Sequence, residues 1–227
     1  MTSKTALKPH LEPFSALSDF EVAQRVLNGD MPLFELLMRR YNRRLFLVAR
    51  SILKDDALAE DVVQESYLIA FEHLAQFKGP DGFGAWLVRI GSRQAMRMLR
   101  RRSRLGLVSN EPGLADEAPA PARMEPEQIQ IDREASHLLE RELDRLPRDF
   151  RIIFVLRELE ELSTAETAES LEITPGTVKS RLHRARSLLQ LRLSRPLAAM
   201  KADAFPFAGT RCDRIVATVF ERLSAKS

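Results

Sequence analysis

The chain has 227 residues, of which 44% are hydrophobic, and its formal net charge at neutral pH is +3. This length and apolar content allow one large or two small domains with a hydrophobic core, which excludes wholesale disorder. A single cysteine, Cys212, excludes an internal disulfide framework and is typical of the reducing cytosol. The four histidines lack metal-ligand spacing, and the longest apolar runs are too short to cross a membrane. We therefore expect a cytoplasmic protein without a metal or cofactor.

The charge is strongly polarised along the chain although its sum is small. Residues 89–104 hold seven arginines and no acid, and residues 173–202 hold seven lysines or arginines and no acid. Two separate basic segments indicate two contacts with a polyanion.

Apolar residues recur mainly with the period of 3.6 that is typical of helices, so the sequence predicts an all-α fold. In the first half we expect four helices, at residues 19–28, 32–53, 57–71 and from 83 into the arginine run. Two glycines and a proline at residues 77–82 indicate a loop. The second helix would turn eight residues inward, namely Leu33, Leu36, Leu37, Tyr41, Leu45, Val48, Ala49 and Ile52.

Residues 106–128 differ from the rest because they contain four prolines and five acids, which predicts a flexible linker. Helices are expected to resume at residues 129–146 and 148–159, separated by Pro147. A last amphipathic helix is predicted at residues 213–223. We therefore expect two small helical domains, at residues 19–105 and 129–194, followed by a tail at residues 195–227.

The most informative stretch, from Ser163 to Arg186, predicts a helix-turn-helix. Ser163 with Glu166 forms a capping box for a short first helix. Thr174 is a good N-cap for the second helix, and Pro175 suits its first position. The second helix would bury an apolar stripe of Val178, Leu182, Ala185 and Leu189.

The remaining faces of that second helix carry cations and hydroxyls, namely Thr177, Lys179, Ser180, Arg181, His183 and Arg184. Such a helix fits the DNA major groove, where cations hold phosphates and arginine binds guanine. The alternative is an ordinary amphipathic pair with a solvated basic face. The caps, the turn length and the charge together favour DNA binding.

Three local patterns, in this order, resemble the extracytoplasmic-function (ECF) group of bacterial RNA polymerase sigma factors, within the sigma-70-like family. Residues 59–71, AEDVVQESYLIAF, are similar to the acidic helix of that group. Residues 77–104 are similar to its loop and arginine-rich helix, and residues 142–186 to its whole second module. The resemblance implies sigma region 2 in the first domain and sigma region 4 in the second.

The resemblance also implies three binding surfaces. The acidic helix would bind the coiled coil of the polymerase clamp through Glu60, Asp61, Gln64 and Glu65; a merely solvated face is the alternative. The second module would bind the upstream (−35) element through the six residues of its recognition helix. The first module would hold the melted −10 strand through Lys78, Asp81, Arg89, Arg93, Arg97, Arg100 and Arg101. Phe83, Trp86 and Ile90 are better explained as core.

The chain departs from the family pattern at two positions. Glu172 stands where the helix-turn-helix usually has glycine, so we expect a less favourable backbone angle or a slightly different turn. Arg93 stands where the group often has asparagine, in the helix that approaches the melted promoter.

The sequence therefore predicts a sigma factor, which binds core RNA polymerase and promoter DNA and has an anti-sigma factor as a further partner. Catalytic residues are not expected, because neither a recognisable triad nor a phosphate-binding glycine loop is present. A helix-turn-helix regulator that is not a polymerase subunit, and a partner-sequestering scaffold, remain as alternatives.

The tail carries an apolar stripe of Ile215, Val216, Val219, Phe220 and Leu223, preceded by Phe205 and Phe207. A free helix of this length is marginal in water, so the stripe is expected to need a docking surface. The chain's own modules and a regulatory protein partner are both candidates. Internal docking would make the tail an autoinhibitory or stabilising brace. For Cys212, a structural or incidental thiol is favoured over an exposed redox switch.

Overall fold

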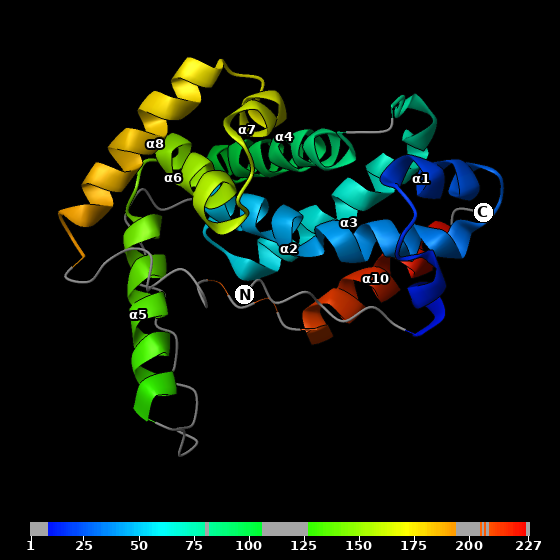
Figure 1. Ribbon diagram of the computed structural model, residues 1–227, viewed down its shortest axis with the longest axis horizontal. Coiled ribbons are helices and arrows are strands. Elements are labelled where there is room, and N and C mark those ends of the chain that lie inside the picture. The colour runs from blue at the N-terminus through cyan, green and yellow to red at the C-terminus, as the bar shows by residue number, and fades with distance from the viewer. Residues whose placement is uncertain are drawn as a thin grey trace.

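The computed structural model describes residues 9–79, 82–105, 127–193, 205, 207 and 209–225, without the side chains of Pro9 and residues 127–135. Within these residues the regular structure is helical throughout, which confirms the all-α class (Figure 1). The expected site residue Asp81 and most of the expected linker lie outside the described residues.

The first module contains four α-helices: α1 (Asp19–Leu27), α2 (Phe34–Leu53), α3 (Asp56–Glu72) and α4 (Phe83–Arg104). Ser18 and Glu21 form a capping box that starts α1. The Asp55 side chain caps α3 by accepting a hydrogen bond from the backbone N–H of Leu58 at 2.9 Å. A 3₁₀ turn at Met31–Leu33 precedes α2, so the helix predicted from residue 32 begins two residues later.

Helix α2 is the centre of this module, and α3 and α4 pack against it. Of the eight residues predicted to point inward, seven are buried and Tyr41 is half-buried. The Tyr41 hydroxyl donates a hydrogen bond to Asp19 and so links α2 to α1. The helical period of the sequence therefore identified the buried face correctly.

Helices α2 and α4 approach so closely at Gly91 that a side chain there has no room. A Cβ atom added to Gly91 would lie 2.3 Å from Cδ1 of Leu45. A larger residue at this position would have to displace the Leu45 side chain, and the backbone angle of Gly91 is not the reason for glycine here.

We expect Gly91→Ala to lower the free energy of unfolding by about 1–3 kcal/mol, because the new methyl group forces Leu45 or the α4 backbone to shift. Urea unfolding followed by circular dichroism measures the change. Gly209→Ala is the matched control, since a Cβ atom at Gly209 meets nothing within 4 Å. Equal stability of the two variants would contradict the close approach.

The second module contains α5 (Glu127–Asp144), α6 (Arg148–Phe154), α7 (Thr164–Leu171) and α8 (Pro175–Gln190). Helix α5 begins at Glu127, two residues inside the segment expected to be linker. A π-helical turn, Val155–Leu159, continues α6, so the helix predicted for residues 148–159 is present but changes its winding. Helix α8 packs against α6 and α7.

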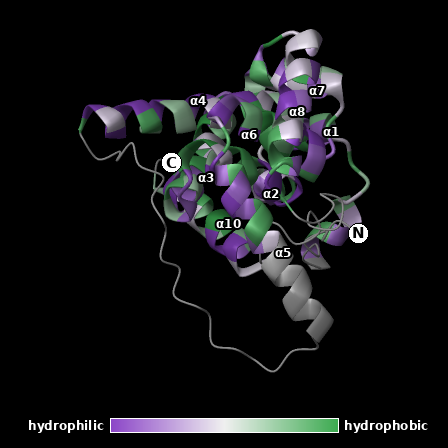
Figure 2. Cartoon of the chain, turned by 90° about the vertical axis from the view of Figure 1, so that its left-hand side faces the viewer, coloured by the Kyte–Doolittle hydropathy of each residue, from purple (hydrophilic) through white to green (hydrophobic). Residues whose placement is uncertain are grey.

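The tail forms α10 (Gly209–Ser224), which begins four residues earlier than predicted. It packs along α3 and α2, on the side of the module away from α4 (Figure 1). Figure 2 shows hydrophilic and hydrophobic residues alternating along α10, as in an amphipathic helix. The tail therefore docks on the chain's own first module, the first of the two candidate surfaces.

Cys212 lies inside this contact and is fully buried, so an exposed thiol is ruled out. The Asn42 side-chain amide donates a hydrogen bond to its sulfur at 3.0 Å. Burial raises the pKa of the Cys212 thiol, although the Asn42 hydrogen bond acts in the opposite direction. The thiol is structural in this arrangement, as favoured from the sequence.

The two modules also pack on each other, which the sequence did not predict. Helix α7 lies against α4, and α6 lies against α2. The buried guanidinium of Arg151 donates hydrogen bonds to the carbonyl oxygens of Asp144 (2.9 Å) and Leu146 (3.0 Å), and also to that of Ser51 in α2. Burial lowers the pKa of Arg151 to about 10. One side chain thus closes the α5–α6 turn and joins it to the first module.

Candidate nucleic-acid and polymerase interfaces

The helix-turn-helix has the caps that the sequence predicts. The Ser163 hydroxyl accepts a hydrogen bond from the Glu166 N–H at 3.1 Å, and the Ser163 N–H donates to the Glu166 carboxylate at 2.7 Å. The Thr174 hydroxyl accepts from the Thr177 N–H at 3.2 Å, with Pro175 at the first position of α8. These caps fix where α7 and α8 begin and therefore how α8 is presented.

The turn between the two helices is built on Glu172, which has a left-handed backbone with φ of 55°. This is the strained angle expected where the family has glycine, because a Cβ atom is unfavourable there. The Glu172 carboxylate receives two hydrogen bonds from Nη2 of Arg93, at 2.7 and 2.8 Å. The two residues that depart from the family pattern therefore form an ion pair between α4 and the helix-turn-helix.

The recognition helix α8 has one buried face and one open face. Its buried stripe consists, as predicted, of Val178, Leu182, Ala185 and Leu189. Of the six predicted DNA-binding residues, four are exposed and two are half-buried: Lys179, Ser180, His183 and Arg184, and then Thr177 and Arg181. The helix therefore leaves a row of cations and hydroxyls accessible to a ligand.

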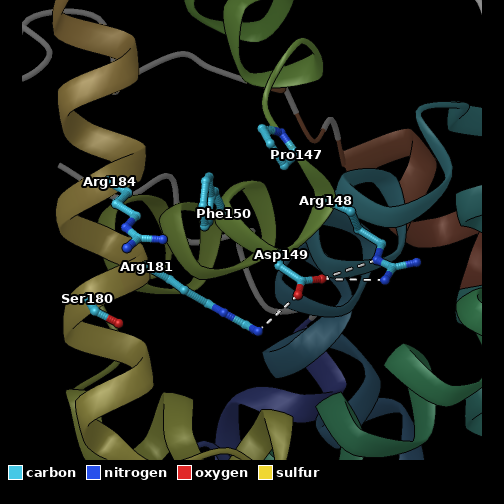
Figure 3. A pocket seen from close by; sticks show the side chains of 7 residues that line it. All are labelled: Pro147, Arg148, Asp149, Phe150, Ser180, Arg181 and Arg184. Carbon is cyan, nitrogen blue, oxygen red and sulfur yellow. Dashed lines mark hydrogen bonds and ion pairs between the residues drawn. The ribbon is translucent and has the colours of Figure 1, made fainter.

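An open hollow of about 550 Å³ lies between α6 and α8. Arg181 and Arg184 line it from α8, and Arg148 lines it from α6 (Figure 3). Asp149 binds Arg181 at 3.1 Å and Arg148 at 3.4 Å, so one carboxylate holds two of the guanidinium groups. This cationic hollow beside the recognition helix suits a DNA phosphate. Arg148 was not among the residues predicted to bind DNA, and its place in this hollow makes it a further candidate.

The predicted −10 residues of the first module lie along α4 and the loop before it. Lys78, Arg93, Arg97, Arg100 and Arg101 are exposed, and Arg89 is half-buried. Their spacing of three or four residues gathers the arginines along α4. Phe83 is buried and contacts Trp86, whose ring centroid lies 5.5 Å away, which agrees with the expectation that these rings belong to the core.

The acidic residues of α3 share one arc of that helix. Asp61 is exposed, whereas Glu60, Gln64 and Glu65 are partly covered. Partial burial raises the pKa of Asp61, and the nearby charges of Glu60 and Asp55 raise it further. The arc therefore concentrates negative charge and favours a cationic partner.

Comparisons with known proteins agree with this architecture. The family model "Sigma-70 region 2" matches residues 37–105, and "Sigma-70, region 4" matches residues 136–189. The ECF RNA polymerase sigma-E factor of Salmonella typhimurium is 33% identical over 76% of this chain and 93% of its own length. The sigma-E factor of Haemophilus influenzae is 33% identical over 77% and 94%.

Two solved structures have a similar fold. The sigma factor RpoE of Bartonella quintana, in complex with the anti-sigma factor NepR, has a TM-score of 0.55 and 27% identity over 73% of this chain and 99% of that chain. CnrH, in complex with the cytosolic domain of CnrY, has a TM-score of 0.55 and 25% identity over 77% and 96%.

A region 2 module followed by a region 4 module defines a sigma-70 family protein. With relatives of this identity and coverage, the chain belongs to the ECF group of that family, and it is a sigma factor that directs transcription initiation. In the described part of the chain no helix is long and apolar enough to cross a membrane. The same residues contain no group of three or more histidine, cysteine or acidic side chains that could hold a metal ion.

The Glu172 turn gives a test of backbone strain in the recognition module. We expect Glu172→Gly to be more stable than Glu172→Ala by about 1 kcal/mol, because both lose the Arg93 ion pair and only glycine relieves the left-handed angle. Denaturant unfolding of the two variants measures the difference. An alanine variant as stable as the glycine variant would contradict strain at this residue.

Proposed function

We propose that the protein joins core RNA polymerase through the acidic arc of α3 and positions two DNA surfaces on the promoter. The open face of α8 binds the upstream element as a duplex. The basic face of α4 holds the melted −10 strand. Chemistry stays with the polymerase, so the protein itself is not an enzyme, and it acts in the cytoplasm.

The observation that carries this proposal is the separation of charge in the fold. The acids of α3 and the cations of α8 and α4 lie on different helices, although the net charge of the chain is only +3. A surface for a basic protein partner is thus kept apart from two surfaces for DNA, as a subunit that bridges polymerase and promoter requires.

A regulatory partner also follows from the neighbours. Both solved relatives, RpoE and CnrH, are in complex with a second protein, NepR or CnrY. We propose that an anti-sigma factor binds this chain as well. Immunoprecipitation of the untagged chain from its own cells would identify that partner.

In-vitro transcription with purified core polymerase tests the proposal as a whole. A sigma factor makes core enzyme initiate at specific promoters. A helix-turn-helix regulator or a sequestering scaffold does not, so absence of promoter-specific transcripts would exclude the proposed function.

For the upstream contact, we expect Arg184→Ala or Lys179→Ala to weaken binding to the −35 element by about 1–3 kcal/mol, because each removes one cation from the open face of α8. Footprinting and titration of promoter DNA measure the loss, and core binding should persist. Arg186→Ala is the matched control, since Arg186 is a cation of α8 that pairs with Glu158. If the test variants lost core binding as strongly as binding to the −35 element, the assignment of this DNA contact to α8 would be wrong.

For the polymerase contact, we expect the double variant Asp61→Lys/Glu65→Lys to bind core polymerase at least roughly tenfold more weakly, because attraction becomes repulsion. Co-purification with core enzyme measures the effect, and circular dichroism checks helicity. Glu12→Lys/Asp30→Lys reverses two exposed acids that lie outside α3, one before α1 and one before α2, and serves as the control. Normal assembly of the test variant would place the clamp contact elsewhere.

A further inference from the structure

The acidic arc of α3 is not open in this structure, because α10 lies along it. Arg214 binds Glu60 through two hydrogen bonds, at 2.5 and 2.7 Å. Arg222 binds Glu65 at 2.9 Å, further along the same helix. Two of the four residues predicted to bind polymerase are thus already paired with arginines of the chain's own tail.

A third arginine extends the contact at the start of both helices. Arg211 donates a hydrogen bond to Asp56 at 2.8 Å and lies 3.8 Å from Glu60. Its guanidinium also lies over the Phe46 ring, 4.3 Å from the centroid. The arginines of α10 meet the acids of α3 in the same order along both helices, so α10 runs parallel to α3.

The apolar face of α10 that adjoins the arginines is buried, and this burial fixes the register of the helix on α3. Ile215 and Val219 are fully buried, and Val216 and Leu223 are 5% exposed. Beside them Asp213 accepts a hydrogen bond from Arg39 of α2 at 2.6 Å. The tail therefore combines an apolar face against α2 and α3 with a cationic edge on the acidic arc.

We propose that α10 is an intramolecular ligand of the polymerase-binding surface, so that core polymerase must displace α10 from α3 as it binds. The inference rests on the proposed role of the acidic arc. A basic helix is also what that arc is proposed to meet on polymerase, so α10 and the clamp offer it the same chemistry and exclude each other.

The outer ion pair on the arc favours exchange over permanent closure, whereas the Glu60 side chain, paired with Arg214, is only 12% exposed. The side chains of Arg222 and Glu65 are 44% and 47% exposed, and ion pairs this exposed contribute little to stability. Asp61 stays exposed beside them and carries a pKa raised by burial and like charges. An incoming cation can therefore meet Asp61 before α10 leaves.

Polymerase can bind only chains in which α10 is released, so the apparent affinity is the intrinsic affinity multiplied by the released fraction. We therefore test Arg214→Glu/Arg222→Glu, which reverses the cationic edge and keeps the buried stripe. The control, Ala217→Glu/Ser224→Glu, adds two acids at exposed positions of the same helix. Hydrogen exchange of α10 amides reports its release, and titration with core polymerase reports affinity.

We expect the test variant to raise exchange in α10 and to bind core polymerase about tenfold more tightly, with the control unchanged. An added peptide of residues 205–225 should compete with core polymerase for the arc of the test variant. Release of α10 without a gain in affinity overturns the proposal. A chain that binds no core polymerase, either as wild type or with α10 released, would instead refute the proposed function.

Discussion

The arrangement of the whole chain depends on four arginines of α2 that each bind a different element. Their glutamate or aspartate partners lie in α1, in α5, in α10 and in the turn that follows α6. The pairs are Arg40 with Asp19, Arg50 with Asp144, Arg43 with Glu160 and Arg39 with Asp213. These guanidinium groups are largely buried, so each needs a carboxylate close by. Arg39 and Arg50 have a second one, from Glu35 and Asp56.

Because of these contacts, α2 supports binding surfaces that lie on other helices. Helices α4 and α8, which are proposed to bind DNA, and the acidic helix α3 are all placed by packing on α2 or on a neighbour of α2. Helix α7, which holds the turn before α8, rests on α4. The recognition module is therefore positioned through the first module in this closed arrangement.

Local features of this fold were predictable from the sequence because they depend on residues close together in the chain. The capping box of Ser163 with Glu166 and the N-cap of Thr174 follow from residue types a few positions apart, and the strained angle at Glu172 follows from the glycine that the family has there. Periodicity gave the buried faces of α2 and α8. Helix starts were wrong by a few residues at α2 and α10, where a 3₁₀ turn or an earlier first turn changes the boundary.

Long-range contacts were not predictable in this way. Arg214 and Glu60 are 154 residues apart, and nothing in either local pattern indicates the other. The pairing of Arg93 with Glu172 was equally hidden, although both residues stood out as departures from the family. The π-helical turn at Val155–Leu159 has the same apolar spacing as an α-helix and leaves no distinct signal in composition. Candidate site residues could therefore be proposed from the sequence, but the residues that cover them could not.

The covalent link between α10 and the face that it covers has a consequence for gene dosage. A separate inhibitor chain dissociates when both proteins are dilute, because the fraction of target that it occupies depends on its concentration. A helix in the same chain is always present at the same effective concentration, which a tether sets in the millimolar range. The covered fraction of this protein is thus independent of how much of it the cell makes, and each newly made copy carries its own cover.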